Sequence, residues 1–223
     1  MKKKNLALFD LDDTLFDGDT EGEWVKYMDQ AGLIQDPEFF SKMESFGKSY
    51  RQGDLNVDEY SEFLLSPLVG KNLKELEDKI DIFTSDVIDR LTDELTEELL
   101  LKHRDDTKIL TSGSLTFLVK VIGQKMGIET CFGTDPQYKD NVFTGKVEGS
   151  PNFSKEKVRR IKIWMKSSHF EKIFAYSDSI HDLPLLEFSD IPSAISPDKK
   201  LLKVAEERKW IVEGRRNTTR SLP

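Results

Sequence analysis

The spacing of hydrophobic positions changes along the chain at about residue 104. Before this point, after one apolar run at residues 6–11, apolar residues recur every three or four positions, which is typical of helices that bury one face. After it, short apolar runs that suit buried strands alternate with helical patterns. Strands that alternate with helices indicate a parallel sheet with helices on both faces, joined by right-handed crossovers.

The first half of the chain is predicted to be almost entirely helical. Asn56 with Glu59, and Asn72 with Glu75, have the spacing of capping boxes, so each pair marks the start of a helix. A long apolar stripe follows, and we expect a break in it at residues 84–85, because one helix of that length is unusual in a globular domain. The helices expected in this half cover residues 24–31, 39–46, 57–64 and 73–99.

The second half is expected to supply the other strands of the sheet. Residues 142–149, VFTGKVEG, have the pattern of a hairpin that turns near Gly145. The last ten residues are rich in Arg, Asn, Thr and Ser and are expected to form a loose tail. We expect strands at 108–113, 128–133, 172–178 and 193–196, and helices at 115–126, 154–166 and 201–208.

The helical block falls between the first strand and all the others, so it is predicted to be an insertion into a sheet domain. The expected fold is therefore α/β, a doubly wound parallel sheet with an inserted all-helical segment. The expected boundaries are 1–17 and 86–212 for the α/β core, 18–85 for the insertion and 213–223 for the tail.

Composition narrows the function. The 223 residues carry a net charge of −8, which disfavours nucleic-acid binding and means that an anionic substrate needs a local positive site. The single cysteine, Cys131, cannot form an intramolecular disulfide, and no apolar stretch approaches the length of a membrane span. We expect a cytoplasmic protein that binds neither nucleic acid nor membrane; its oligomeric state stays open.

Groups capable of chemistry follow three of the predicted strands. These groups are Asp10 and Asp12, Thr111 and Ser112, and Asp178 and Asp182. Because ligands of parallel sheets bind beyond the carboxyl ends of the strands, we expect all three pairs to meet at one edge. Taken singly, each pair has an alternative interpretation as a turn or a helix cap. Carboxylates that are costly to bury, gathered at one sheet edge, indicate a bound cation or catalysis.

With these motifs the chain resembles the haloacid dehalogenase-like hydrolase superfamily, in its phosphoserine-phosphatase-like IB subgroup. The family's DxDx(T/V) motif stands here as DLDDT from Asp10, and its strand-closing Ser or Thr stands as Thr111. Its lysine at a helix start matches Lys157 in NFSKEKVRR, which could otherwise be a solvated basic helix face. Its acidic pair matches Asp178 and Asp182 in YSDSIHDLP. The similarity covers about residues 5–212, and it implies that the inserted helices form a cap over the active site.

The resemblance implies catalytic and metal-binding roles. Asp10 would be the nucleophile that forms an aspartyl-phosphate, and Asp12 would protonate the leaving group and later deprotonate the attacking water. Mg²⁺ would be held by Asp10, Asp178 and the backbone carbonyl of Asp12, with Asp182 orienting this shell or ligating through water. Two departures from the family, Asp13 for a small residue and Ser177 for glycine, remove no reacting group.

The resemblance also implies substrate-binding roles. Thr111 and Lys157 would hold the phosphoryl oxygens, and Ser112 is a further candidate beside Thr111. Asp19 stands nine residues after Asp10, near the position where phosphoserine phosphatases place an acid that binds an amino group. The other candidates in the inserted segment are Arg51, Glu23, Trp24, Tyr27 and Tyr50.

The sequence therefore predicts a Mg²⁺-dependent phosphomonoesterase that hydrolyses a small phosphorylated metabolite. An amino-bearing ester such as phosphoserine, histidinol phosphate or phosphocholine fits the candidate residues. A phosphotransferase or mutase would use the same intermediate and stays open as an alternative. A non-hydrolytic phospho-receiver module also arranges acids, a Thr or Ser and a Lys around one Asp, but the long insertion and Asp12 argue against it.

Overall fold

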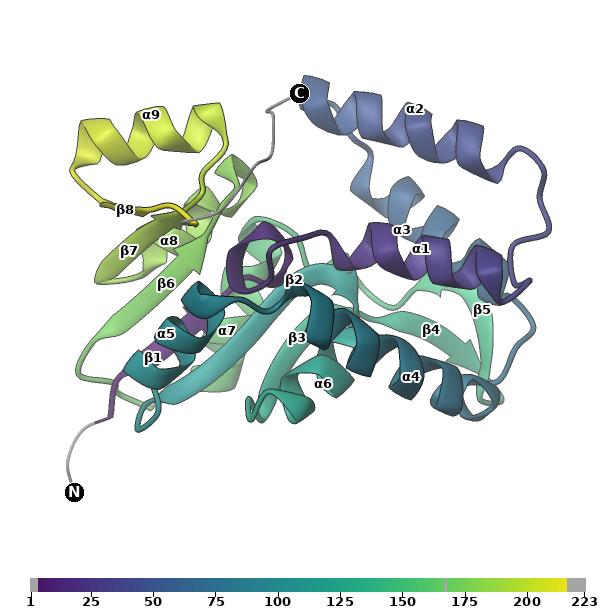
Figure 1. Cartoon of the computed structure of the whole chain (residues 1–223), viewed down its shortest axis with the longest axis horizontal. Helices are drawn as coiled ribbons and strands as arrows, with labels where there is room; N and C mark the ends of the chain where they lie inside the picture. Colours follow the sequence, from purple (N-terminus) through teal and green to yellow (C-terminus); the bar gives the residue numbers. More distant parts are fainter. Residues whose placement is uncertain (1–3, 167, 216–223) are drawn as a thin grey trace.

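The computed structural model describes residues 4–166 and 168–215 (Figure 1). Within these residues, one sheet of six parallel strands has the order β3-β2-β1-β6-β7-β8. Its strands are β1 (Leu6–Phe9), β2 (Thr107–Leu115), β3 (Thr130–Thr134), β6 (Ile173–Ser177), β7 (Ile191–Ile195) and β8 (Ile211–Glu213). The expected doubly wound α/β fold is confirmed.

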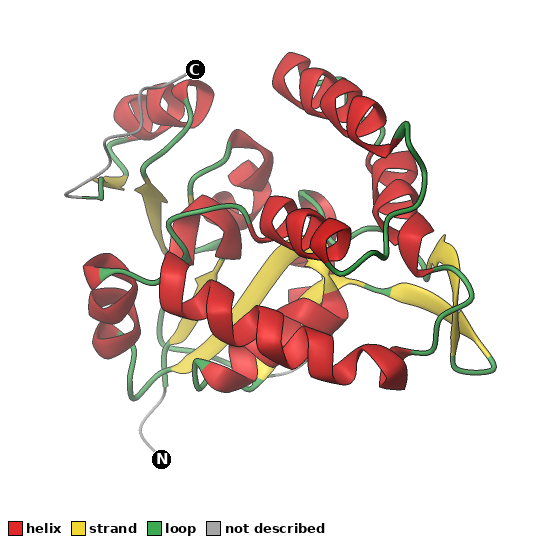
Figure 2. Ribbon diagram, turned by 45° about the vertical axis from the view of Figure 1, so that its right-hand side comes forward, coloured by secondary structure: helices red, strands yellow, loops and turns green. Residues whose placement is uncertain are grey.

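The central strands are apolar on both faces because helices cover both of them. In β1, Ala7 and Phe9 face one apolar cluster and Leu6 and Leu8 face another, since alternate residues of a strand point to opposite sides. The helices α1 (Thr20–Gln30), α4 (Leu73–Leu91) and α6 (Thr116–Lys125) contribute to the first cluster. The helices α7 (Lys155–Met165), α8 (Leu183–Phe188) and α9 (Lys199–Arg208) contribute to the second, and Figure 2 shows helices in front of and behind the sheet.

The segment between β1 and β2 is helical, as expected. It also contains α2 (Phe39–Gln52), α3 (Val57–Leu65) and α5 (Glu94–Lys102), with short turns at Leu11–Leu15 and Ser66–Leu68. Asn56 accepts from the backbone N–H of Glu59 at the start of α3, and Asn72 caps α4 by accepting from Lys74. Figure 1 shows α2 on the outer side of this segment, beyond α1.

Two local expectations were wrong. Residues 84–85 lie inside an unbroken α4, where their hydroxyls donate to the carbonyl of Asp81 one turn earlier, and the break comes at Thr92, before Asp93 caps α5. Residues 142–147 form one strand, β5 (Val142–Val147), which pairs with β4 (Pro136–Lys139). The hairpin turns at residues 140–141, where both residues have positive φ and suit a tight turn of this kind.

The C-terminal end of the sheet extends further than the sequence predicts. Glu213 belongs to β8, and Arg215 has a buried side chain. The rest of the expected tail, residues 216–223, lies outside the described residues. Within the part of the chain that the structure describes, no helix is both long and apolar enough to cross a membrane.

Candidate active site

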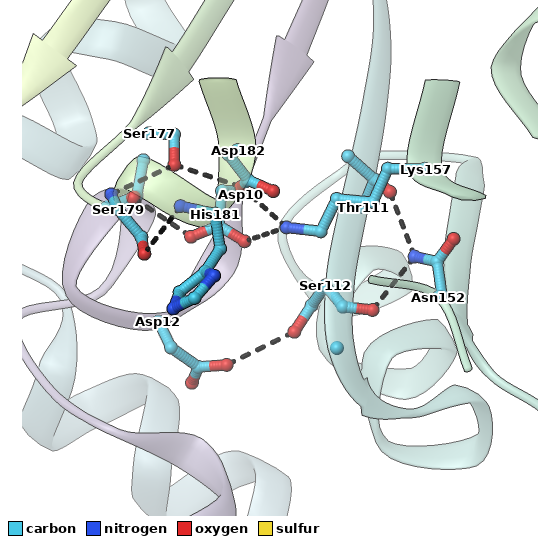
Figure 3. A network of polar contacts seen from close by, with 12 residues as sticks. Asp10, Asp12, Thr111, Ser112, Asn152, Lys157, Ser177, Ser179, His181 and Asp182 are labelled. Carbon is cyan, nitrogen blue, oxygen red and sulfur yellow. Dashed lines mark hydrogen bonds and ion pairs between the residues drawn. The ribbon is translucent and has the colours of Figure 1, made fainter. Parts of the chain in front are cut away.

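The carboxyl ends of β1, β2 and β6 bring the predicted groups together around a cavity of about 340 Å³ (Figure 3). These strands are neighbours in the sheet, so residues far apart in sequence meet where the strands end. The predicted site residues that line this cavity are Asp10, Asp12, Asp19, Tyr50, Arg51, Ser112, Lys157, Asp178 and Asp182. A larger hollow between α4, α6 and β4 lacks this set of groups.

Lys157, in the first turn of α7, joins two carboxylates across the sheet edge. Its Nζ donates to Asp10 Oδ1 at 2.7 Å and to Asp182 Oδ2 at 2.6 Å (Figure 3). All three side chains are nearly fully buried, and Asp182 Oδ2 also accepts from the Ser177 hydroxyl. Burial by itself would lower the pKa of Lys157, but the two carboxylates outweigh it and hold this pKa above its ordinary value. Lys157 is therefore a fixed positive charge.

Asp12 is held by three donors. Its Oδ1 accepts from the backbone N–H of Thr20, and its Oδ2 accepts from the hydroxyls of Ser112 and Ser114, each at 3.1 Å. Burial raises the pKa of Asp12 to about 6, with repulsion from Asp19 adding to it, while the bonds to Thr20 and Ser114 act in the opposite direction. A carboxyl with a pKa near neutrality can both give up and take a proton, as a general acid and base must.

Thr14 links the first motif to the acid that follows β6. Its hydroxyl lies 3.0 Å from Asp10 Oδ2 and 3.2 Å from Asp178 Oδ1, so it can donate to either, and it accepts from the backbone N–H of Asp178. These contacts fix both carboxylates toward the same end of the cavity. The turn that carries Thr14 includes Asp13 at φ 52°, a left-handed conformation that aspartate tolerates better than most residues.

The carboxylates of Asp10 and Asp178 carry more negative charge than the protein compensates. Burial raises the pKa of Asp10 to about 7, against the attraction of Lys157, and the charges of Asp182 and Asp12 raise it further. Burial and the charge of Asp10 also raise the pKa of Asp178 well above its ordinary value. Such a site is suited to a cation, because a cation would stabilise both ionised carboxylates.

The donor set fits Mg²⁺ in one specific way. Within residues 4–166 and 168–215, no three acidic, histidine or cysteine side chains are grouped so that they could hold a metal by themselves. Mg²⁺ does not need such a group, because it keeps several waters and takes one or two carboxylates in proteins. Asp10 and Asp178, bridged by Thr14, supply two carboxylates, and Asp182 is already engaged by Lys157 and Ser177.

Thr111 and Ser112 do not both face the cavity. Thr111 is fully buried and accepts from the Asn152 amide, whereas Ser112 lines the cavity and donates to Asp12 (Figure 3). Neighbouring residues of a strand point to opposite faces, so only one of the two can reach the substrate. Asn152 also donates to the carbonyls of Ser112 and Phe132 and thereby holds β2 and β3 at this edge.

The side of the cavity lined by α1, α2 and α3 contains acidic and aromatic groups. Asp19 is exposed and caps α1 by accepting from Gly22, and Arg51 is exposed on α2. Glu21, two residues after Asp19, lies at the cavity and accepts from the Tyr60 hydroxyl of α3 at 3.0 Å. Burial raises the pKa of Glu21 to about 8, and the charges of Asp19 and Asp12 add to this effect.

Aromatic rings from α2 and from the segment before α7 meet at His181. Its ring lies 5.1 Å from that of Tyr50 on α2 and 5.0 Å from that of Phe153, measured between centroids. The Tyr50 hydroxyl is also 3.4 Å from the Ser179 hydroxyl. Two other expected cap candidates lie elsewhere: Trp24 and Tyr27 stack on each other beside Phe83 in the core, and neither lines the cavity.

Several residues of the site had no prediction attached to them. They are Ser114, Asn152, Glu21 and Tyr60. Ser114 lies two residues after Ser112, so alternation along the strand predicts that both face the same side. The sequence gives no such indication for Asn152, because its partners come from two other segments. Glu23 was expected at the cavity, but it forms ion pairs with Lys26 and Arg90 instead.

Comparison with known proteins places this site in a family. The sequence profile of the haloacid dehalogenase-like hydrolases matches residues 7–187. The chain is 31% identical to a histidinol-phosphatase of Neisseria meningitidis over 94% of this chain and 98% of that protein. It is 26% identical to a phosphoserine phosphatase of Methanocaldococcus jannaschii, over 91% of this chain and 90% of that one.

Solved structures agree with this grouping. A crystal structure of a protein of unknown function from Bordetella pertussis Tohama I is 30% identical, with a TM-score of 0.86, and covers 95% of this chain and 99% of that one. A substrate-bound phosphoserine phosphatase shares the fold, with a TM-score of 0.66 at 24% identity over 97% of this chain and 96% of that one.

The chain therefore belongs to the haloacid dehalogenase-like hydrolase family, and within it to the phosphoserine-phosphatase-like group. It is a phosphoric monoester hydrolase. Phosphatases of this family generally use Mg²⁺ and act on small phosphorylated substrates.

Proposed function

We propose that this enzyme hydrolyses a small, amino-bearing phosphate monoester with Mg²⁺, through an aspartyl-phosphate on Asp10. The observation that carries the proposal is the contact of Lys157 with Asp10, a buried carboxylate that also faces Asp178 across the Thr14 hydroxyl. A phosphate monoester is an anion, so attack by a carboxylate needs positive charge at the reacting centre.

Asp10 and Asp178 would hold Mg²⁺, together with the backbone carbonyl of Asp12, while Asp182 would keep Lys157 in place. Bound there, Mg²⁺ would neutralise charge on the phosphoryl group and on the nucleophile. Lys157 supplies the second positive charge, and its contact with Asp10 orients that carboxylate and favours its ionised form.

The two half-reactions then follow from the positions of Asp10 and Asp12. An oxygen of Asp10 attacks phosphorus, the bond from phosphorus to the ester oxygen breaks, and Asp12 gives its proton to the leaving alkoxide. In the second step Asp12 takes a proton from water, this water attacks phosphorus, and the bond to Asp10 breaks to release phosphate. Ser112, which lines the cavity, is assigned the phosphoryl contact in place of Thr111, which does not.

The substrate class follows from the charge at the cap side. Asp19 and Glu21 supply two carboxylates there, and the aromatic rings of Phe46, Tyr50 and Tyr60 also line the cavity. A cationic amino or imidazolium group would be attracted by these acids and would stabilise the ionised form of Glu21, whose pKa is raised by burial and by the charges of Asp19 and Asp12. The histidinol-phosphatase and phosphoserine phosphatase names of the relatives agree with an amino-bearing ester.

A screen of phosphate esters tests the proposal. The purified enzyme with Mg²⁺ is expected to release phosphate from amino-bearing esters such as histidinol phosphate and O-phosphorylethanolamine faster than from uncharged analogues. Adding an acceptor alcohol separates hydrolysis from transfer, because a phosphotransferase would form the new ester in place of free phosphate. Absence of phosphate release from every ester in the presence of Mg²⁺ would sink the proposal.

A further inference from the structure

Arg215, which follows β8, has a nearly fully buried side chain (exposed fraction 2%). One terminal nitrogen of its guanidinium donates to the backbone carbonyl of Thr14 at 2.5 Å, and the other lies 2.5 Å from Asp93 Oδ2. The Nε is 3.8 Å from Asp17. A buried charge is costly to leave unpaired. The guanidinium is therefore expected to stay in place between Thr14 and Asp93.

The contacts hold the turn that carries the catalytic motif from outside the cavity. Thr96, in the first turn of α5, donates to the carbonyl of Leu15 at 2.6 Å, next to the carbonyl that Arg215 binds. Asp93, which caps α5, is the residue that pairs with Arg215. Burial alone would raise the pKa of Asp93, but Arg215 and the capping bonds outweigh this effect and lower it. The turn is thereby fixed to both α5 and the segment that follows β8.

The residue at the centre of this arrangement is Thr14. Its carbonyl accepts from Arg215, and its hydroxyl contacts the carboxylates of Asp10 and Asp178. A displacement of the Thr14 backbone would therefore move the hydroxyl that aligns the nucleophile with the second carboxylate. Such supporting contacts are worth about 10- to 100-fold in metal affinity or activity in metal sites generally.

We propose that Arg215 is a positioning residue, which connects the C-terminal end of the sheet to the Asp10–Thr14 turn and keeps Asp10 and Asp178 aligned. Arginine suits this position, because its planar fork reaches a carbonyl and a carboxylate at once, and lysine has no such fork. The inference rests on the proposed function, because its kinetic test measures phosphatase activity. It adds to the proposed active site a supporting residue that lies far from the motifs in sequence.

The test compares Arg215→Gln with Arg208→Gln, a matched change at a more exposed arginine that pairs with Glu187 at the end of α9. With p-nitrophenyl phosphate, Arg215→Gln is expected to lower kcat by about 10- to 100-fold with little change in KM, and Arg208→Gln to leave both unchanged. Without substrate, the Mg²⁺ concentration that gives half of the thermal stabilisation is expected to rise for Arg215→Gln only. Asp93→Asn keeps an oxygen that can cap α5. It is expected to lower kcat and to raise the Mg²⁺ concentration for half of the thermal stabilisation, as Arg215→Gln does.

A second control separates positioning from general stability. Leu201→Ala removes a fully buried side chain of α9 from the opposite face of the sheet. It is expected to lower Tm by at least as much as Arg215→Gln does, while its kcat stays within about twofold of wild type. Wild-type kcat and Mg²⁺ response in folded Arg215→Gln would overturn the proposal, and so would an equal loss of kcat in Leu201→Ala. If the Gln variant does not fold, Arg215→Lys takes its place with the same criteria.

Failure of the proposed function gives a different result. A wild-type enzyme that hydrolyses no ester contradicts the proposed function, and the Mg²⁺ stabilisation still compares Arg215→Gln with wild type.

Discussion

The ammonium group of Lys157 donates to Asp10 at 2.7 Å, from a helix that begins 145 residues after that aspartate (155 against 10). The contact places a positive charge directly on the proposed nucleophile. Because Asp10 is also repelled by Asp182 and Asp12, its ionised form depends on Lys157 and on any bound cation. Substituting each charged residue, or removing the cation, is therefore expected to have a separate, measurable effect.

Asp10→Asn is expected to lower kcat by more than about 10³-fold, because an amide cannot form the acyl phosphate. The fold should be retained, and the Tm of the metal-free protein should not fall, since the change removes repulsion among buried carboxylates. Asp105→Asn, at a solvent-exposed aspartate, serves as the control and should behave as wild type. Near-normal hydrolysis of p-nitrophenyl phosphate by pure Asp10→Asn enzyme contradicts the assignment.

Asp12→Asn is expected to slow hydrolysis by about 10²- to 10⁴-fold for an alkyl phosphate, which needs a proton on its leaving group. An aryl phosphate with a good leaving group needs less protonation, so the formation of the intermediate should be affected less. Burst kinetics with p-nitrophenyl phosphate measure that first step directly. Equal losses for the first step with both kinds of ester would remove general acid catalysis from the role of Asp12.

Removal of Mg²⁺ with a chelator is expected to abolish activity and lower Tm, and added Mg²⁺ should restore both. Asp178→Asn should raise the Mg²⁺ concentration needed for half-maximal stabilisation by about tenfold or more, because it removes one of the two proposed carboxylate ligands. Asp190→Asn, just before β7, is a control whose carboxylate accepts from the backbone N–H of Ile173 outside the cavity. Full activity in excess chelator rules out the metal's role.

The sequence predicted the sheet and the ends of its central strands because these features depend on local patterns. The continuous apolar run of β1 and the acids that follow it are visible within about ten residues. The Asn56 and Asn72 caps are equally local, and both helices begin where their spacing predicts. The break expected at residues 84–85 was wrong because it was inferred from the length of the apolar stripe alone. Packing of α4 against the core supports a longer helix.

Features that depend on distant contacts were not predictable. Nothing near Arg215 in sequence indicates that it reaches Thr14, which lies at the opposite end of the chain. Asn152 holds Thr111 and two strand carbonyls that come from other segments. The motif pattern favoured Thr111 over Ser112 for the phosphoryl contact. The orientation of β2 in the sheet determines which side chain faces the cavity, and it is Ser112.

Asp19 and Glu21 are expected to select for a cationic substrate. O-phosphorylethanolamine and ethyl phosphate differ only in the amino group, so their kcat/KM ratio isolates that group. Asp19→Asn and Glu21→Gln should each lower kcat/KM for O-phosphorylethanolamine by about 10- to 100-fold, the range for a hydrogen bond to a charged group, and for ethyl phosphate by much less. Glu23→Gln, whose carboxylate is paired with Lys26 and Arg90, is the matched control and should keep the wild-type ratio. Equal losses on both esters remove that acid from the selectivity argument.

Glu21 should also make the stability of the metal-free enzyme depend on pH. Its pKa is raised from an ordinary 4.5 to about 8 by burial, so the folded state binds this proton more tightly than the unfolded state. The stabilising contribution is complete below about pH 4.5 and is lost as the pH rises through about 8. The Tm of wild type relative to Glu21→Gln is therefore expected to fall between pH 5 and pH 8 and then to level off.

Two variants make this comparison specific, because the other carboxylates of the site are present in all of them. Tyr60→Phe removes the hydroxyl that stabilises the ionised Glu21, so its Tm should fall more steeply with pH than that of wild type. Glu97→Gln, at an exposed position of α5, should run parallel to wild type. A constant difference in Tm between wild type and Glu21→Gln from pH 5 to pH 9 would show that Glu21 is ionised throughout, and its carboxylate would then be solvated and not held at the cavity.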